Sequence, residues 1–472
     1  MRAKNLYRTM KSIFWILLLV ISFPSCNGVV NHDCLITNVN IVNVKTGKIL
    51  KNKSIAIDNN RITAIYDKEI ISSDSTIVIN GSGKYLIPGL WDMHAHYKWS
   101  HVDMDPLLIA NGITGIREMW GNMPIMADIP KKSQIEKSLS PDIYTSGDLI
   151  DGNPPSFPGF TGTIVVTTPD EAVEAVDKQI EGNVDFIKVY SSLSEECFMA
   201  ISKEAKKKNI PFAGHIPNRV SIYKAIDAGM ASSEHLYGFL YACSSETNNR
   251  ISPVGKSNEV ILSTFSEERF NSLCYVLAKS NMWLCPTLTV NRSLGYLNDT
   301  TFTNDTRMAY LPGYLIDIWN QKIKGFNKID LDNFVKSAKA RYLFELDLIG
   351  KMNKKGVKLL AGTDFPNPFC FPGFSLHDEL SLMVKGGMSA LDALRTATLN
   401  AAIFMNKEND FGTVEVGKLA SLVLLNKNPL ENIENTSSIE TVILRGRVID
   451  RTTLDKMLSQ TQSNTPKIQN SN

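Results

Sequence analysis

Residues 86–96 read Leu-Ile-Pro-Gly-Leu-Trp-Asp-Met-His-Ala-His, an apolar run that ends in two histidines. In a β-strand, residues i and i+2 point to the same side, so His94 and His96 can enter one site from one strand. Imidazole is a frequent ligand of divalent metal ions. The stretch therefore predicts a strand that carries a pair of metal ligands at its carboxyl end.

Four further short runs also place a side chain suited to metal binding or proton transfer at or near their carboxyl ends. These runs are 185–190 with Lys188, 211–215 with His215, 230–235 with His235, and 357–364 with Asp364. Collecting such side chains at the carboxyl ends of successive strands is how a (β/α)8 barrel builds an active site. One histidine at a strand end is more often structural, but four of the seven histidines occupy such positions. The pattern predicts a metal-dependent hydrolase, with His32, His101 and His377 left as structural or surface residues.

The middle of the chain, 89–408, alternates strand-like and helical stretches, which is typical of a parallel α/β fold. The helices that we expect here are 169–181, 194–208, 266–280 and 389–405. Two segments interrupt the alternation. Residues 151–162 are rich in Pro, Gly and Phe and predict a loop after the third strand, whereas 291–355 predicts a helical insertion with a helix over 331–354. Long connections on the catalytic face usually shape specificity.

The two ends of the mature chain have the residue pattern of β-strands and not the alternation of strands and helices. Residues 33–88 and 409–452 show alternating apolar and polar residues with turn signals, so we expect them to form one small composite β-sandwich beside the barrel. Residues 453–472 are rich in Ser, Gln and Asn, and we expect a disordered tail there.

Residues 1–26 have the pattern of an export signal, in which a basic stretch precedes an apolar run over 13–23. That run is shorter than the ~20 residues of a membrane span. Ser25 before Cys26 resembles a bacterial lipoprotein signal, so we expect Cys26 to be lipidated and the protein to be anchored in the bacterial cell envelope, in the periplasm or at the outer membrane. An ordinary secretory signal or an uncleaved anchor are the alternatives.

Charge and cysteine content exclude some classes of protein. The net charge is +2, and loss of residues 1–25 would leave 46 basic against 48 acidic residues, which gives no sign of nucleic-acid binding. The six cysteines other than Cys26 lie far apart without C-x-x-C spacing. Buried free thiols are the favoured interpretation, with a disulfide as the alternative in an oxidising compartment.

Lys188 and Asp364 have the chemistry that such a site needs. A buried lysine is costly unless it is neutralised or paired, and desolvation lowers its pKa. The neutral amine can then add CO2, and the resulting carbamate can bridge two metal ions; a lysine that reaches solvent or pairs with an acid is the alternative. Asp364 can bind a metal ion with one oxygen and act as general base with the other.

Taken together, these segments resemble the amidohydrolase superfamily, in the branch with imidazolonepropionase-like and Xaa-Pro dipeptidase-like members. The resemblance extends over about 33–450 and rests on 88–96, 112–117, 185–190, 214–215, 234–236, 285–288, 362–364 and the helix near 387–402. It implies a TIM barrel with a composite β-sandwich and two divalent metal ions, with zinc as the default. The implied ligands are His94 and His96 on the more buried ion, His215 and His235 on the more exposed ion, carboxylated Lys188 bridging both, and Asp364 on the first.

The expected activity is hydrolysis of an amide or other C–N bond by metal-bound hydroxide, with dipeptides or N-acyl amino acids as the first substrate class. Tyr190 and Arg219 lie next to ligands and have the chemistry to hold a carbonyl or a carboxylate, although packing or a surface position would also explain them. An inactive surface-anchored binding protein and an active lactone or phosphotriester hydrolase remain alternatives, because fold does not fix function.

Overall fold

The structure is a computed structural model that describes residues 31–70, 73–97, 103–121, 139–246 and 257–464. The predicted signal segment 1–26, its Cys26 and His101 lie outside the described residues. Within these ranges, no helix has the length and apolar character needed to cross a lipid bilayer. The six described cysteines are all buried and free, as predicted: Cys34, Cys197, Cys243, Cys274, Cys285 and Cys370.

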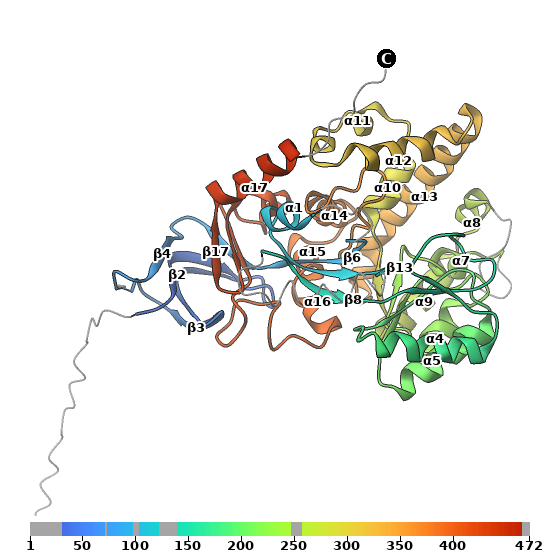
Figure 1. The fold of residues 1–472 in the computed structure, drawn as a ribbon, viewed down its shortest axis with the longest axis horizontal. Coiled ribbons are helices and arrows are strands. Elements are labelled where there is room, and N and C mark those ends of the chain that lie inside the picture. The colour runs from blue at the N-terminus through green and yellow to red at the C-terminus, as the bar shows by residue number, and fades with distance from the viewer. Residues whose placement is uncertain (1–30, 71–72, 98–102, 122–138, 247–256, 465–472) are drawn as a thin grey trace, which may run out of the picture.

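Short parallel strands form the centre of a TIM barrel, which occupies the right-hand part of Figure 1. They are β6 (Leu90–Ala95), β7 (Ile113–Glu118), β8 (Asp142–Thr145), β11 (Ile187–Val189), β12 (Phe212–Gly214), β13 (Ser232–Glu234) and β14 (Trp283–Cys285). A parallel bridge between Ser146 and Phe186 joins β8 to β11. β9 (Leu149–Asp151) and β10 (Thr163–Val165) pair beside β11 and flank the predicted loop after the third strand.

The eighth position of the barrel is filled by 357–365, which the sequence predicted as a strand up to Asp364. On one side Leu360 N donates to Leu284 O at 2.9 Å, and on the other Met93 N donates to Ala361 O at 2.8 Å. The segment forms isolated bridges rather than a regular strand, so this part of the prediction is wrong. The physical reason is that the backbone N–H groups of this segment donate to different parts of the barrel instead of to one neighbouring strand. Thr363 N, for example, donates to the Asp92 side chain.

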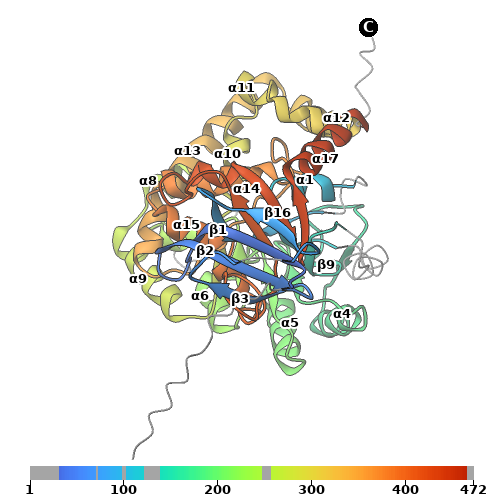
Figure 2. The same cartoon turned by 90° about the vertical axis from the view of Figure 1, so that its left-hand side faces the viewer.

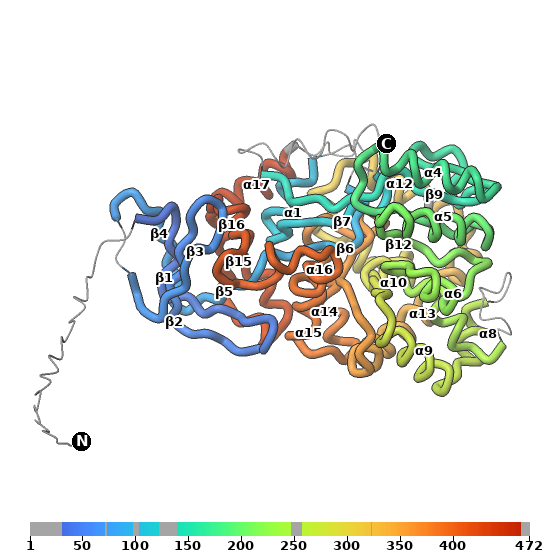
Figure 3. The backbone as a smooth tube through the Cα atoms, turned by 90° about the horizontal axis from the view of Figure 1, so that it is seen from below, coloured from blue at the N-terminus to red at the C-terminus, as the bar shows by residue number. Residues whose placement is uncertain are grey.

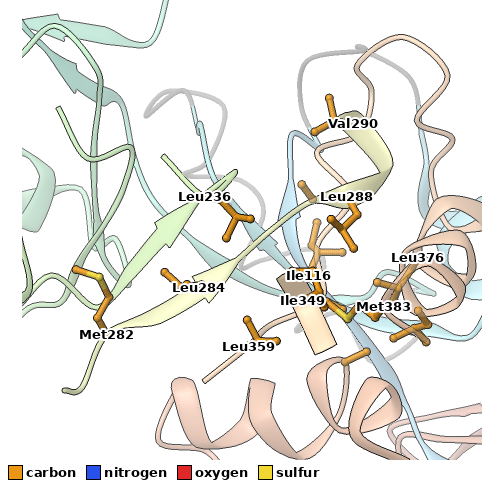
Figure 4. Close-up of a cluster of buried hydrophobic side chains, with 14 of the residues drawn as sticks. Ile116, Leu236, Met282, Leu284, Leu288, Val290, Ile349, Leu359, Leu376 and Met383 are labelled. Atoms are coloured by element: carbon orange, nitrogen blue, oxygen red, sulfur yellow. The ribbon is translucent and has the colours of Figure 1, made fainter. Parts of the chain in front are cut away.

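Helices cover the outside of the barrel and begin where polar side chains cap them. Thr168 forms a capping box with Glu171 at the start of α4, and serines cap α5 and α9. The helices of the barrel layer are α1 (Asp105–Ala110), α4 (Pro169–Glu181), α5 (Glu195–Lys207), α6 (Ile222–Asp227), α7 (Phe239–Cys243), α9 (Glu267–Lys279) and α14 (Phe374–Lys385). Figure 4 shows part of the apolar core between strands and helices, including Leu284 of β14 and Leu376 of α14.

The single helix expected over 389–405 is two helices, α15 (Ala390–Thr396) and α16 (Leu399–Phe404). The break has a clear cause at the barrel wall. Trp91 N donates to Ala397 O at 2.8 Å and Ala361 N donates to Thr396 O at 3.3 Å. Those two carbonyls serve barrel strands instead of the next helical turn, which ends α15.

The predicted helical insertion is confirmed, and it lies above the barrel in Figure 1. Its elements are α10 (Leu288–Gly295), α11 (Thr300–Thr303), the 3-10 turn η1 (Thr306–Tyr310), α12 (Gly313–Lys324) and α13 (Lys328–Lys354), with α8 (Asn258–Ser263) beside α13. The insertion has a small core of its own that includes Leu297, Leu315 and Trp319 and packs on Phe369 and Phe371. The insertion is therefore packed around a core separate from that of the barrel.

Strands from both chain ends lie beside the barrel in one sheet, at the left of Figure 1 and facing the viewer in Figure 2. Its strands are β1 (Cys34–Val42), β2 (Ile49–Asp58), β3 (Arg61–Tyr66), β4 (Ile77–Asn80), β5 (Tyr85–Pro88), β15 (Leu422–Leu425), β16 (Ile439–Leu444) and β17 (Arg447–Asp450). β5 joins the two halves because it pairs with β1 on one side and with β15 on the other. Ile62 of β3 exchanges hydrogen bonds with Gly417 and Lys418, so the sheet curves back on itself around its own core instead of forming two separate sheets.

The disordered tail expected at 453–472 is wrong for its first part, which forms α17 (Arg451–Asn464). Leu454 is fully buried, and Met457 and Leu458 pack against the same core. These apolar residues have the i, i+3, i+4 spacing of a helix face, a signal that the polar composition of the tail obscures. In Figure 3, α17 and α1 lie together at the junction of sheet and barrel, in agreement with their direct contact.

Candidate metal and active site

A pocket of about 300 Å³ opens at the carboxyl ends of the barrel strands. It brings together all six residues that the sequence predicted as ligands, which are His94, His96, Lys188, His215, His235 and Asp364. His96 Nε2 lies 2.8 Å from Asp364 Oδ1, and His94 Nε2 lies 3.3 Å from the same oxygen. The rings of His94 and His235 are 4.6 Å apart. Residues that are up to 270 positions apart in the chain thus form one compact cluster.

The backbone is strained where these side chains enter the pocket. His235, Thr287 and Asp364 have φ angles of 56°, 46° and 62°, in the left-handed region that non-glycine residues seldom occupy. Such residues persist only where the surrounding structure holds them, and they concentrate at functional sites. Here the hydrogen bonds from His235 N to Cys285 O and from Asp364 N to His94 O hold the turns in place.

Three of the histidines engage one ring nitrogen with the protein and leave the other available. Nδ1 of His94 lies 2.8 Å from a Glu234 oxygen, Nδ1 of His215 lies 2.8 Å from Ser191 Oγ, and Nδ1 of His235 lies 2.6 Å from Thr287 Oγ1. Partners of this kind fix the tautomer and the orientation of metal-binding imidazoles. Burial lowers the pKa of His235 to about 3 and holds the pKa of His215 well below its usual value, so both rings are in the neutral form that binds metal.

The residues present fit a divalent cation. Because the carboxylate of Glu234 can only accept, Nδ1 of His94 donates to it, and Nε2 is the ring nitrogen that faces the pocket. That Nε2 lies 3.3 Å from Asp364 Oδ1, and Nε2 of His96 lies 2.8 Å from the same oxygen. A divalent cation placed among these atoms would bind the lone pairs of both imidazoles and of the carboxylate. His94, His96 and Asp364 each offer one ligand atom within 4.8 Å of the others.

Lys188 enters the pocket from the end of β11 and is 1% exposed. Burial lowers the pKa of its amine to about 8, and the nearby carboxylates of Glu234 and Asp364 only partly oppose that shift. A substantial fraction of the amine is therefore neutral near pH 8, and a neutral amine is the form that reacts with CO2.

A buried ion pair lies directly beneath the histidines, and the sequence analysis assigned no role to it. Arg117 is fully buried and donates to Met93 O, to Ser232 Oγ and to Glu234 Oε2, at 2.6, 2.8 and 2.8 Å. The same Glu234 oxygen accepts from His94 Nδ1. Burial disfavours the charge of Glu234, but Arg117 and His94 hold its pKa below the usual value. The sequence signal that could have predicted this pair is a charged residue inside each of two buried strands, Arg117 in β7 and Glu234 in β13, because buried charges need partners.

Aromatic side chains form the wall of the pocket near β11 to β13. The ring of His215 is stacked between Tyr190, at 3.8 Å, and Tyr237, at 4.3 Å. Trp120 and Phe157 line the same side, and Phe157 comes from the loop predicted over 151–162. Tyr190 thus lines the pocket as the sequence suggested.

Arg219, the other residue singled out for substrate binding, is exposed and does not line this pocket. The arginine that does so is Arg341 of α13, which no sequence motif marks. It lies within the predicted insertion, so the sequence located the segment but not the residue. Val290, Leu294 and Phe334 of the same insertion also line the pocket.

Comparisons with solved structures place this architecture among known folds. A Xaa-Pro dipeptidase with bound methionine in its active site superposes with a TM-score of 0.65 at 21% identity, over 88% of this chain and 99% of that one. Bottromycin amidohydrolase gives a TM-score of 0.69 at 21% identity, over 91% and 89% of the two chains. At these identities the likeness establishes the barrel with its additional β-domain and nothing finer.

Sequence comparisons match shorter stretches. Adenine deaminase 2 of Shouchella clausii (strain KSM-K16) is 27% identical over 214 residues, 42% of this chain and 36% of that protein. A probable imidazolonepropionase of Homo sapiens is 36% identical over 109 residues, 22% of this chain and 25% of that protein. The chain spans about a third or less of the length of these curated relatives. The model of the amidohydrolase family matches residues 170–449, more than half of the chain, and the chain belongs to the amidohydrolase family.

Proposed function

We propose that this protein is a metal-dependent hydrolase that cleaves an amide or other C–N bond in a small substrate. The observation that carries the proposal is the buried cluster of His94, His96 and Asp364 in the pocket, whose ligand atoms all lie within 4.8 Å of one another. A deaminase and a dipeptidase among the relatives and structural neighbours support chemistry at C–N bonds as the reaction class.

The pocket has the side chains to hold two divalent ions, with zinc as the first candidate, and other divalent metals suit the same nitrogen and oxygen ligands. The ligands would be His94, His96, His215, His235, Asp364 and Lys188 as its carbamate. When bound, the ions would polarise the scissile carbonyl and lower the pKa of water to about 7. Lys188 would gain its carbamate by addition of the neutral amine nitrogen to the carbon of CO2, with release of one proton.

The protein's own residues then orient the substrate and move the proton. Asp364 lies where it can accept a proton from the attacking water and return it to the nitrogen that leaves as the C–N bond breaks. Tyr190 and Tyr237 flank the pocket on either side of His215 and limit how a carbonyl can approach. Dipeptides and N-acyl amino acids are the substrate class that we propose first.

The test combines metal analysis with a turnover screen against dipeptides and N-acyl amino acids. We expect close to two metal ions per chain, and we expect Asp364→Asn to keep most of the metal while losing ~10²–10⁴-fold in kcat. Asp410→Asn, at an exposed pair with Arg61, is the matched control and should behave as wild type. Absence of metal after metal-replete expression, or wild-type turnover in Asp364→Asn, would refute the proposal.

We also propose, on the sequence pattern of residues 1–26, that the protein is exported and anchored to the bacterial envelope through a lipidated Cys26. Mass spectrometry of the membrane-extracted protein should find a diacylglyceryl group on an N-terminal Cys26. An intact Met1 would contradict the anchor, without bearing on the catalytic proposal.

A further inference from the structure

Arg341 is a cation of the pocket wall outside the cluster of proposed metal ligands. It lies in the middle of α13 and lines the pocket together with the six clustered residues. Its Nε donates to Glu345 at 2.8 Å, and one Nη donates to the backbone oxygen of His235 at 3.3 Å. The guanidinium has five N–H donors, and no described residue accepts from its other Nη group. The guanidinium is therefore held on one side by Glu345 and the His235 backbone, and its other Nη group can donate to a ligand.

The position of Arg341 relative to the cluster limits what it can bind. The residue whose backbone oxygen it contacts, His235, belongs to the proposed metal site. Its guanidinium also lies 6.0 Å from the ring of Tyr237, which stacks on His215 at 4.3 Å. A group held by Arg341 thus lies in the same pocket as the atoms that would be hydrolysed. In an N-acyl amino acid the carboxylate carbon is three bonds from the scissile carbonyl carbon, so one small substrate can bring both groups into this pocket.

The neighbours of Arg341 add a second constraint. Val290, Leu294 and Phe334 line the same pocket with apolar side chains, and α10, which carries Val290 and Leu294, packs against α13. An apolar side chain next to an anionic group would satisfy both parts of this wall. Arginine binds carboxylates through paired, charge-assisted hydrogen bonds, which gives orientation as well as affinity.

We propose that Arg341 binds the free α-carboxylate of the substrate, so that the preferred substrates are N-acyl amino acids and dipeptides whose leaving amino acid is apolar. This inference rests on the proposed hydrolase function and assigns its leaving-group specificity to the insertion rather than to the barrel. Arg341 acts on binding and not on the bond-breaking step, so its loss changes KM more than kcat.

The experiment compares N-acetyl-leucine with N-acetyl-leucinamide, which differ only in the carboxylate. Wild type should prefer the acid, and Arg341→Gln should raise KM for the acid by ~10–100-fold while leaving the amide unchanged, since hydrogen bonds to charged groups contribute on that scale. Arg341→Lys should recover part of the preference because it keeps the charge. Arg219→Gln, which removes an exposed arginine outside the pocket, is the matched control.

Binding of the product leucine, measured by calorimetry on the metal-loaded protein, separates this inference from the hydrolase proposal. If wild type turns over neither compound but binds leucine and not leucinamide, and Arg341→Gln loses that binding, the carboxylate site stands and the proposed reaction fails. If wild type does not distinguish acid from amide, or if Arg341→Gln weakens both equally, the inference is overturned. Thermal melting of each variant shows whether a loss comes from unfolding instead.

Discussion

One arginine–glutamate pair lies beneath the histidines and another lies in the pocket wall, and the two differ mainly in burial. Arg117 and Glu234 form a pair in the barrel beneath the histidines, with 0% of either side chain exposed. Arg341 and Glu345 form a pair on α13 with the same 2.8 Å separation, but 23% of the arginine side chain is exposed. The fully buried arginine has its donors directed to protein atoms, whereas the partly open one keeps donors for a ligand. The same kind of ion pair thus holds the ring of His94 in one place and presents a cation to the pocket in the other.

The two pairs also differ in how the chain forms them. Arg117 and Glu234 are 117 residues apart and meet only when β7 and β13 take their places in the barrel. Arg341 and Glu345 are four residues apart on one helix, so they are neighbours wherever that helix packs. We therefore expect changes to the barrel pair to disturb fold and chemistry together, and changes to the helix pair to disturb binding alone.

The largest expected effect is that of Glu234→Gln. The substitution leaves the Arg117 charge buried without a counter-charge and replaces the carboxylate that orients His94 with a neutral, weaker acceptor. Loss of one member of a buried ion pair costs about 3–5 kcal/mol in the free energy of unfolding, which urea denaturation will measure. We expect metal content and kcat to fall as well. If Glu234→Gln has wild-type stability and metal content, the pair does not support the site.

A smaller effect concerns Glu379 of α14, which links the barrel layer to the insertion. Its carboxylate accepts from the backbone N–H groups of Leu288 and Thr289 at the start of α10, at 2.9 and 2.7 Å. Burial nevertheless raises its pKa to about 7, from 4.5. The folded protein therefore binds more protons at this residue than the unfolded chain does, and its contribution to stability declines as the pH rises from 4.5 to 7.

The shift corresponds to at most about 3 kcal/mol between these pH values, since one pKa unit is worth ~1.4 kcal/mol. Glu379→Gln should flatten that part of the stability profile, as followed by urea denaturation at pH 5 and pH 8. Glu415→Gln, on a largely exposed pair with Lys45, provides a comparison variant. A decline with pH that persists unchanged in Glu379→Gln would show that another group causes it.

Features that depend on local sequence could be predicted, whereas features that depend on contacts between distant segments could not. The six proposed ligands stand at or near the ends of apolar runs, so local pattern and spacing sufficed to locate them: His94, His96, Lys188, His215, His235 and Asp364. Neither arginine was given its role, because a charged residue's partner depends on which elements become neighbours. The sequence also failed to predict the break between α15 and α16 and the irregular eighth barrel position. The reason is related: backbone N–H groups of the barrel donate to carbonyls that local periodicity would pair within a helix.

The smallest effect is expected from Glu345→Gln, which repeats in the helix pair the substitution made in the barrel pair. Both glutamates are fully buried, so the two variants differ only in what surrounds the partner arginine. Arg341 is partly exposed and can turn its charge towards water, and Asn291 can still donate to the oxygen of the new amide. We expect a loss of about 1–2 kcal/mol in the free energy of unfolding, the cost of one weakened buried hydrogen bond.

On the carboxylate site, Glu345→Gln should raise KM for N-acetyl-leucine by only a few-fold with kcat unchanged, because Arg341 stays in place but is held less firmly. Compared with Glu234→Gln, it tests directly whether the barrel supports metal binding and catalysis while the insertion determines substrate binding. If Glu345→Gln lowered kcat and metal content as Glu234→Gln should, the helix pair would belong to the catalytic framework, and burial would not be what separates the two roles. A change confined to KM would instead place substrate choice in the insertion, where sequence can change without disturbing the histidine cluster.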